Sequence, residues 1–193
     1  IARNPKIFCG YSDTTALLSA IYSKTGMKTY MGPSYSSFKM EALQDYQTES
    51  WLKAVSQTSY ELTPSEKWGD NAWYLPDAPL TFHETEWKVY HHGQAQATAI
   101  GGNLSTFSLL RGTPYAPTDD NYVLFVEEAE EDHYVEFERN LAALLQAYPN
   151  PQALLIGRFP KECQMTEELL LYILDKHPIL KTIPVLYDLD FAH

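Results

Sequence analysis

The C-terminal half of the chain alternates between apolar runs typical of buried strands and amphipathic stretches typical of helices. Strands are expected at 122–126, 153–159 and 183–187, and helices between them at 134–148 and 166–177. This β–α–β–α–β order predicts a parallel sheet. Because the carboxyl ends of parallel strands share one edge, residues that follow different strands can meet there.

The N-terminal half begins with a smaller α/β unit and then becomes irregular. A helix is expected over 14–24 with Gly26 closing it, followed by a short strand over 27–31. Residues 34–83 are rich in Tyr, Ser, Pro and charged side chains and contain one expected helix at 48–56. This composition indicates a linker or an active-site lid.

A second unit is expected to begin after this irregular stretch. Its predicted elements are strands at 87–90 and 96–100 and a helix at 104–110 that Asn103 caps. The whole chain therefore predicts an α/β fold in two parts, 1–82 and 83–193.

Ser12 lies where an apolar run meets a short turn that opens into a helical pattern. Gly10, two residues earlier, lets the backbone bend tightly, and such a strand-to-helix turn exposes a serine hydroxyl beside the free N–H groups of the helix. An alternative is that Ser12 and Asp13 only cap the helix, since the turn lacks the second glycine of the usual nucleophile elbow. The local sequence leaves both interpretations open.

Two further reactive groups follow expected strands. Glu127 comes directly after the run 122–126, and His193 follows the strand at 183–187. The 66 positions between them (193 − 127) do not prevent contact if both strands end at one sheet edge. The neighbouring acids Glu128, Glu130 and Glu131 are alternatives, and such a run is often a solvated loop before a helix. We favour Glu127 because it follows the apolar run directly.

The chain is acidic, with 25 Asp and Glu against 14 Lys and Arg and a formal net charge of −11. This charge repels phosphate backbones and anionic lipids, so neither nucleic acid nor a membrane is an expected partner. Cys9 and Cys163 lack paired spacing, which favours a reducing compartment over a disulfide framework or a metal knuckle. With no long apolar run and no signal-peptide pattern, we expect a soluble, cytoplasmic protein.

Both ends of the chain suggest a fragment. It begins at Ile1 without Met, and its last residue is a candidate catalytic group. A parallel sheet that began here would leave an uncovered edge, so we expect further sequence or a partner segment before Ile1.

Several short motifs are spread across nearly the whole chain, at residues 4–13 (NPKIFCGYSD), 20–33, 100–104 (IGGNL), 112–115 (GTPY), 124–127 (LFVE) and 190–193 (DFAH). In their order and approximate spacing, these motifs together resemble the LD-carboxypeptidase family of serine peptidases. The long stretch 35–73 is more similar to the microcin C immunity branch than to the murein tetrapeptide carboxypeptidases.

The resemblance implies a Ser-Glu-His triad. Ser12 would attack an amide carbonyl, His193 would accept and return the proton, and Glu127 would orient the imidazole. The N–H of Asp13 would be one oxyanion donor, and the second would come from a glycine turn upstream of this chain. No metal or other cofactor is implied.

The resemblance also implies an architecture and a class of substrate. An N-terminal flavodoxin- or Rossmann-like α/β domain, here only its C-terminal part, would supply the serine, and a C-terminal α/β domain would supply Glu and His. A homodimer is expected. The substrate would be a small peptide or a peptidyl nucleotide, so the activity is microcin-C-like immunity or murein tetrapeptide cleavage; a catalytically inactive binding homologue is the alternative outside enzymes.

Three other features have competing interpretations. The Gly101–Gly102–Asn103 turn lacks the spacing of a phosphate loop and is expected to allow close approach of the substrate to the backbone. Trp68 and Trp73 either stack on a flat group such as a nucleobase or anchor the long loop. Arg158 either binds a substrate carboxylate or forms a surface ion pair.

Overall fold

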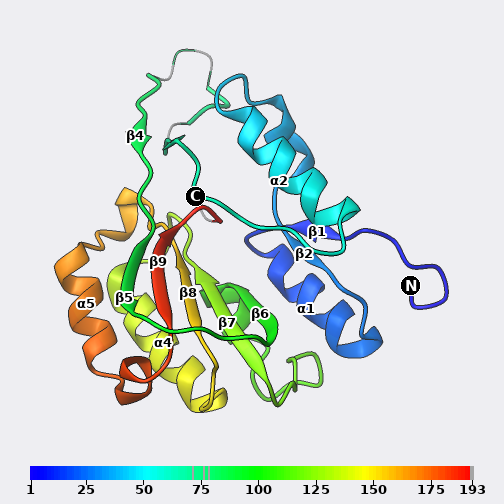
Figure 1. Ribbon diagram of the computed structural model, residues 1–193, viewed down its shortest axis with the longest axis vertical. Coiled ribbons are helices and arrows are strands. Elements are labelled where there is room, and N and C mark those ends of the chain that lie inside the picture. Colours follow the sequence, from blue (N-terminus) through cyan, green and yellow to red (C-terminus); the bar gives the residue numbers. More distant parts are fainter. Residues whose placement is uncertain (71, 76, 78, 192–193) are drawn as a thin grey trace.

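A five-stranded sheet organises the C-terminal half of the computed structural model, which describes residues 1–70, 72–75, 77 and 79–191 (Figure 1). In spatial order its strands are β5 (Lys88–His91), β9 (Val185–Leu189), β8 (Leu154–Gly157), β7 (Tyr122–Glu127) and β6 (Thr98–Asn103). The strands β6 to β9 are mutually parallel, and β5 pairs antiparallel with β9 at one edge. The predicted α/β class and the parallel order are confirmed.

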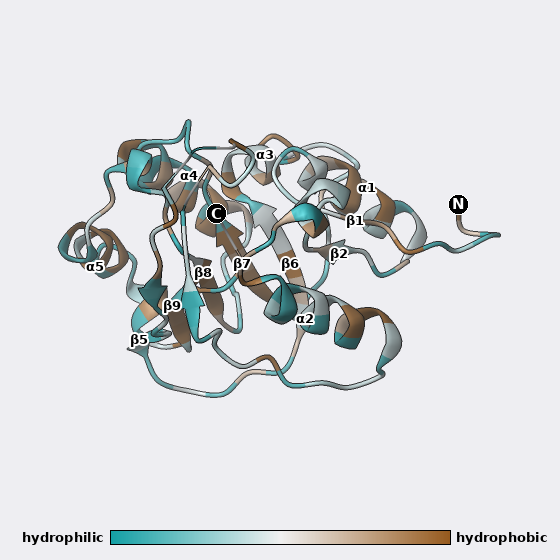
Figure 2. Cartoon of the chain, turned by 90° about the horizontal axis from the view of Figure 1, so that it is seen from above, coloured by the Kyte–Doolittle hydropathy of each residue, from teal (hydrophilic) through white to brown (hydrophobic). Residues whose placement is uncertain are grey.

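Helices cover one face of this sheet. The chain moves stepwise from β6 to β9 through α3 (Leu104–Ser108), α4 (Tyr134–Ala147) and α5 (Glu167–Asp175). Right-handed crossovers taken in one direction place the connecting helices on the same side, as Figure 2 shows. The core between them consists of fully buried aliphatic side chains, including Leu124, Val126, Leu141, Leu154 and Leu174.

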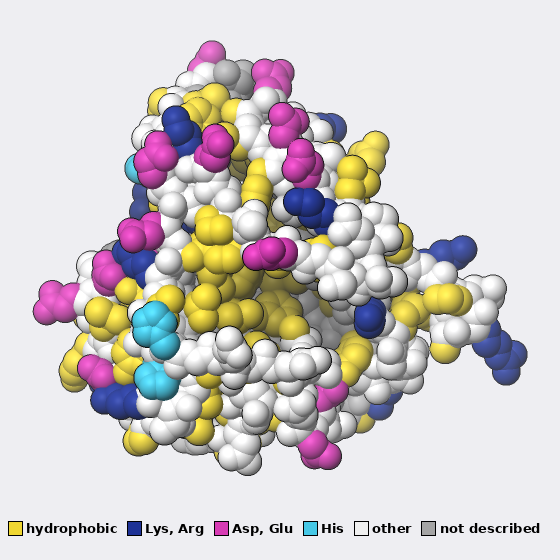
Figure 3. Space-filling view, viewed as in Figure 1, with side chains coloured by type: hydrophobic (Ala, Val, Ile, Leu, Met, Phe, Trp, Pro, Cys, Tyr) yellow, Lys and Arg dark blue, Asp and Glu magenta, His cyan; other side chains and the backbone are white. Residues whose placement is uncertain are grey.

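The opposite face of the sheet is less fully covered. Strand residues alternate in direction, so Phe125, between the core residues Leu124 and Val126, points away from the helices and is half-buried. Viewed from this side, the surface is hollowed and lined with hydrophobic side chains (Figure 3). This face of the sheet is therefore open to solvent.

The N-terminal part is a small α/β unit at the β6 edge. Strands β1 (Cys9–Gly10) and β2 (Tyr30–Met31) pair in parallel, and α1 (Thr14–Thr25) connects them. Gly26, with φ 67°, ends α1 in the left-handed conformation that favours glycine, as the sequence predicts. This helix packs against β6 and α3.

The segment between the two parts has little regular structure. It contains a 3-10 turn at Tyr35–Lys39, the helix α2 (Gln44–Ser56), and two short antiparallel strands, β3 (Lys67–Trp68) and β4 (His83–Glu84). No residue of α2 is buried. Two further 3-10 turns, Lys161–Cys163 and Pro178–Lys181, flank α5.

Element boundaries differ from the expectations by a few residues. The strand expected at 27–31 contains only two residues, because β1, its partner strand, pairs with only two residues. The helix expected at 48–56 begins four residues earlier. The helix at 104–110 ends at Ser108 in a series of turns. Within the described residues, no helix has the length and apolar character needed to cross a membrane.

Candidate active site

Ser12 adopts a conformation that is uncommon for a residue with a side chain. Its φ is 54°, in the left-handed region, directly before α1 begins. A Cβ on Gly10 would lie 2.7 Å from Cγ2 of Thr14, so a larger residue at position 10 would force the Thr14 side chain to move. Asp13, at the N-cap position, makes no side-chain capping hydrogen bond to α1. The left-handed Ser12 before α1 has the backbone geometry expected of a nucleophile turn.

The first backbone N–H groups of α1 lie beside Ser12. Those of Thr14 and Thr15 donate to the carbonyls of Tyr11 and Ser12. Among the described residues, the N–H of Asp13 meets no hydrogen-bond acceptor. Asp13 lies at the N-terminus of α1, where the helix dipole is positive. This N–H group is available to stabilise an oxyanion formed at a carbonyl that Ser12 attacks.

Two hydrogen bonds fix this turn against β6 and α3. The backbone N–H of Asn103 donates to Oγ1 of Thr15 (3.0 Å), and Oγ1 of Thr106 donates to Oδ1 of Asp13 (3.1 Å). Asn103 also caps α3, as predicted, because its Oδ1 accepts from the N–H of Thr106 at 3.0 Å. Sequence reasoning missed Thr15, since nothing in the local pattern distinguishes it from any helical threonine.

The two glycines before Asn103 allow this close approach. Gly101 has φ 145°, and a Cβ there would lie 1.8 Å from the carbonyl oxygen of Phe125. Gly102 has φ 133°, and a Cβ there would lie 2.5 Å from Oγ1 of Thr15. Glycine is thus required so that β6 can approach β7 on one side and α1 on the other.

Glu127 lies at the carboxyl end of β7, paired in register with Asn103 on β6. It is 2% exposed, and among the described residues neither carboxylate oxygen meets a hydrogen-bond donor. Burial raises the pKa of Glu127 to about 7, against the opposing effect of the Asn103 side chain. By strand alternation it shares the open face with Phe125. A buried carboxylate without a donor is suited to hold a cationic or hydrogen-bonding partner.

Glu128 is also buried, at 1% exposure, contrary to the solvated loop considered for the acids after β7. It follows Glu127 and therefore points to the helix-covered side, where burial and the neighbouring Asp132 raise its pKa to about 9. The exposed Glu130 and Glu131 continue the loop. The two buried acids thus face different environments, and Glu127 is the one at the open face.

His193 lies outside the described residues, but the chain leading to it ends at the open face. Phe191 packs edge-to-face against Phe125, with ring centroids 5.9 Å apart. Phe125 and Glu127 lie two residues apart on one face of β7. His193 follows Phe191 by two positions in the sequence.

Arg158 and Asp190 form an ion pair that the sequence did not reveal. Arg158 follows β8 and its Nη2 lies 2.5 Å from Oδ1 of Asp190, just after β9. Their side chains are 9% and 7% exposed. The sequence analysis considered an ion pair at the surface, and the observed ion pair is buried. A single sequence carries no signal that pairs residues 32 positions apart.

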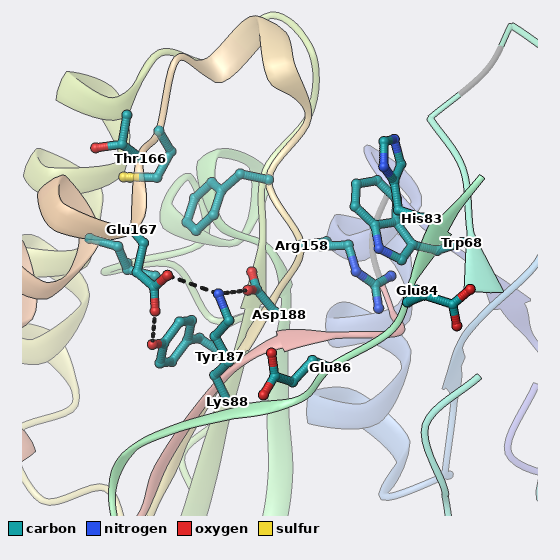
Figure 4. Close-up of a pocket in the computed structure, with 13 residues that line it drawn as sticks. Trp68, His83, Glu84, Glu86, Lys88, Arg158, Thr166, Glu167, Tyr187 and Asp188 are labelled. Carbon is teal, nitrogen blue, oxygen red and sulfur yellow. Dashed lines mark hydrogen bonds and ion pairs between the residues drawn. The ribbon is translucent and has the colours of Figure 1, made fainter. Parts of the chain in front are cut away.

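A pocket of about 380 Å³ adjoins this ion pair at the carboxyl ends of β8 and β9 (Figure 4). In the close-up, Arg158 points toward Trp68 and His83, and Lys88 lies between Glu167 and Asp188. The Trp68 ring contacts both His83 (centroids 4.7 Å apart) and the Arg158 guanidinium (4.8 Å), which fits its expected role as a loop anchor. In the part of the chain that the structure describes, no cluster of His, Cys, Asp and Glu could hold a metal ion.

Comparison with known families agrees with this arrangement. A family model described as "LD-carboxypeptidase C-terminal domain" matches residues 96–193, and one described as "LD-carboxypeptidase N-terminal domain" matches residues 1–32. The chain belongs to the LD-carboxypeptidase family. The resemblance noted from the sequence motifs is therefore confirmed.

Relatives within the LD-carboxypeptidase family span the whole chain. "Putative carboxypeptidase YocD" of Bacillus subtilis is 38% identical over 197 residues, covering 100% of this chain and 61% of that protein. The microcin C7 self-immunity protein MccF of Escherichia coli is 31% identical, covering 100% of this chain and 60% of MccF. An MccF-like protein from Bacillus anthracis has a solved structure with a TM-score of 0.95 at 38% identity, covering 100% of this chain and 61% of that one.

Two further matches bear on the choice of substrate within the LD-carboxypeptidase family. A solved structure of MccF in complex with aspartyl sulfamoyl adenosine matches at a TM-score of 0.83 and 30% identity, covering 100% of this chain and 61% of that one. The "Probable murein peptide carboxypeptidase" of Bacillus subtilis is 30% identical over 135 residues, covering 69% of this chain and 37% of that protein. The chain thus spans about three fifths of the curated relatives that it matches in full.

Proposed function

We propose that Ser12, Glu127 and His193 form a catalytic triad that hydrolyses an amide bond through an acyl-enzyme. His193 accepts the proton of Ser12 as the hydroxyl oxygen attacks the carbonyl carbon, and returns it to the leaving amine. Glu127 orients the imidazole and stabilises its cation. The N–H of Asp13 donates to the oxyanion, and a donor of this kind contributes about 3 kcal/mol of transition-state stabilisation.

The observation that carries this proposal is the left-handed Ser12, held through Thr15 against the strand pair that bears Glu127. Such a conformation is unfavourable for serine, so it persists because the surrounding contacts impose it. It presents the hydroxyl at the start of α1, where backbone N–H groups stabilise negative charge. The contact of Phe191 with Phe125 supports the approach of His193 to the same face.

We infer that the substrate is a peptidyl or aminoacyl nucleotide, as in microcin C immunity. The full-length match to MccF, whose solved structures include complexes with aspartyl sulfamoyl adenosine and glutamyl sulfamoyl guanosine, supports this choice. Asn103 and the glycines before it lie beside Glu127 and would contact the acyl part of the substrate. Trp73 is 38% exposed and contacts Tyr74 edge-to-face, whereas the Trp68 ring lies between Arg158 and His83, so Trp73 has the more accessible ring for stacking on a nucleobase.

Cleavage of murein tetrapeptide is the second candidate. This candidate is supported by the similarity of 69% of the chain to a probable murein peptide carboxypeptidase. Both reactions use the same attack on an amide and differ in the group that follows the scissile bond.

An assay with the full-length protein separates these possibilities. Aminoacyl sulfamoyl adenosine and murein tetrapeptide are each incubated with the wild type and with Ser12→Ala, and released nucleoside or D-Ala is measured. Nucleoside release that depends on Ser12 supports the nucleotide reaction, and D-Ala release supports the murein reaction. A wild type that binds either compound with no turnover contradicts the catalytic proposal and indicates a binding homologue.

A further inference from the structure

The carboxylate of Asp190 accepts hydrogen bonds from three separate segments of the chain. Its Oδ2 accepts from the backbone N–H of Ser65 (2.9 Å) and from Nε1 of Trp87 (2.8 Å). Its Oδ1 accepts from the Ser65 hydroxyl (2.9 Å) and from Nη2 of Arg158 (2.5 Å). Burial alone raises the pKa of this carboxyl, but the Ser65 and Arg158 donors outweigh that effect and lower it, so Asp190 is a buried anion.

The segment 65–87 is held at both of its ends by this one residue. Ser65 lies before β3 and Trp87 lies after β4, and the Ser65 hydroxyl is also 2.7 Å from that of Thr85. Between these ends, Trp68 packs over the guanidinium of Arg158, which itself pairs with Asp190 (Figure 4). Both ends of the segment 65–87, which we call its base, are therefore fixed to the carboxyl ends of β8 and β9.

The same carboxylate lies close in sequence to the proposed general base. Only two residues separate Asp190 from His193 in the sequence. Phe191, between them, packs on Phe125 two residues before Glu127. A displacement of Asp190 would therefore be transmitted directly to the segment that ends in His193.

We propose that Arg158 and Asp190 are positioning residues that fix together the base of residues 65–87 and residues 189–191, the segment that leads to His193. This inference rests on the proposed function, because it assigns the pair a role in presenting the triad histidine. It also explains why a buried ion pair is present at all. A pair of this kind seldom adds stability over an apolar pair of equal size, but its fixed hydrogen-bond directions specify one geometry.

The first test measures local opening by hydrogen exchange and does not depend on activity. Asp190→Asn is compared with the wild type and with Asp175→Asn, a control that removes a carboxylate from the exposed ion pair with Lys181. Asp190→Asn should speed exchange at 65–68, 83–87 and 186–191, with core amides of β7 and β8 unchanged. The control should leave all of these amides as in the wild type.

The second test measures kcat and KM on the substrate that the wild type cleaves. Asp190→Asn should lower kcat by about 100-fold, the typical effect of misplacing a reacting group by about 1 Å. KM should change much less than kcat, because the loss concerns the transition state. Asp175→Asn should retain the wild-type kcat. Arg158→Met combined with Asp190→Leu removes both charges and leaves no unpaired one, but the Ser65 N–H and Trp87 Nε1 lose their acceptor, so kcat should remain low in this double variant.

The outcomes distinguish this inference from the proposed function. Faster exchange at the 65–87 base and at 186–191, with reduced kcat in both the single and the double variant, supports it. Unchanged exchange in Asp190→Asn, faster exchange at only one of the two segments, or recovery of kcat in the double variant overturns it. If the wild type cleaves nothing in a Ser12-dependent manner, the proposed function fails, and hydrogen exchange still decides whether the pair holds both segments.

Discussion

The hydroxyl oxygen of Thr15 accepts a hydrogen bond of 3.0 Å from the backbone N–H of Asn103, 88 positions further along the chain. Thr15 lies in the first turn of α1, three residues after Ser12, and Asn103 pairs with Glu127 across β6 and β7. This single contact therefore joins the helix that presents the nucleophile to the strands that present the acid. Both residues are buried, so water does not compete for the bond.

Replacing Thr15 with Val should destabilise the protein and disturb the site together. The substitution keeps the side-chain shape and leaves the N–H of Asn103 buried without an acceptor, which costs about 1–3 kcal/mol. The midpoint and slope of urea unfolding measure this loss. Thr182→Val, which removes an exposed hydroxyl bonded to a local carbonyl, is the control and should change stability by less than about 0.5 kcal/mol.

Replacing Ser12 with Ala should reduce kcat by about 10⁴-fold or more, because the nucleophile is lost while the fold is retained. Circular dichroism and thermal unfolding should show a protein as folded as the wild type. Ser12→Val should in addition lose about 1–2 kcal/mol of stability, since a β-branched residue is strained at φ 54°. Ser23→Ala, near the end of α1, serves as the control, and residual turnover in Ser12→Ala near the wild-type rate would exclude Ser12 as the nucleophile.

The two buried glutamates predict a decrease in stability as pH rises. Their pKa values are raised from 4.5 to about 7 for Glu127 and about 9 for Glu128, mainly by burial. Between pH 4.5 and 9 the folded state therefore binds more protons than the unfolded state, and the free energy of unfolding falls with increasing pH. Urea titrations at pH 5 and pH 8 should differ by a few kcal/mol.

Matched amide variants separate the two acids. Glu128→Gln should remove the larger part of the pH dependence, above pH 7 especially, and leave most of the activity. Glu127→Gln should remove the smaller part, below pH 7, and reduce kcat strongly because the imidazole of His193 loses its orienting anion. Equal activity losses in the two variants would argue against the assignment of Glu127.

Activity should rise between pH 5 and pH 8. His193 must be neutral to accept the proton of Ser12, and an unperturbed histidine loses its proton near pH 6.5. On the acidic side the slope of log kcat/KM against pH should be one or steeper, because Glu127, whose pKa burial raises to about 7, must also be ionised. A flat profile over this range would contradict the role of His193.

Gly101→Ala should destabilise the protein far more than Gly26→Ala. Both glycines have positive φ, but a Cβ at Gly101 would collide with the Phe125 carbonyl, whereas none of the surrounding atoms lies within 4 Å at Gly26. The control should lose about 1 kcal/mol from backbone strain alone. Gly101→Ala should lose more than about 3 kcal/mol, or fail to fold, because backbone cannot be moved out of the way as a flexible side chain can. Thermal unfolding of the two variants tests this order.

The sequence was sufficient to predict a parallel sheet and the alternation of strands and helices along the chain. Apolar runs at 122–126 and 183–187 mark strands with one face buried under the helices and the other face half-buried, so both faces carry apolar side chains. Asn103 and Gly26 were predicted as caps because their roles depend on local hydrogen bonds and backbone conformation. These features require only residues that are close in sequence.

The contacts that assemble the site were not predictable in this way. Thr15, Ser65 and Trp87 have ordinary local environments, and their partners lie 88 to 125 positions away. The burial of Glu128 likewise depends on packing against another layer, since an acidic run by itself is typical of a solvated loop. Pairing over such separations is decided by tertiary structure, which a single sequence does not encode in a readable pattern.

The anchoring of residues 65–87 at both ends has a consequence for how such a protein can diversify. A loop whose ends are already fixed can lengthen at small entropic cost, about 0.6 kcal/mol for each doubling of its length. Insertions between Trp68 and His83 would therefore leave the Asp190 contacts and the sheet intact. Segments inserted there could change which ligand is bound without altering the proposed catalytic residues.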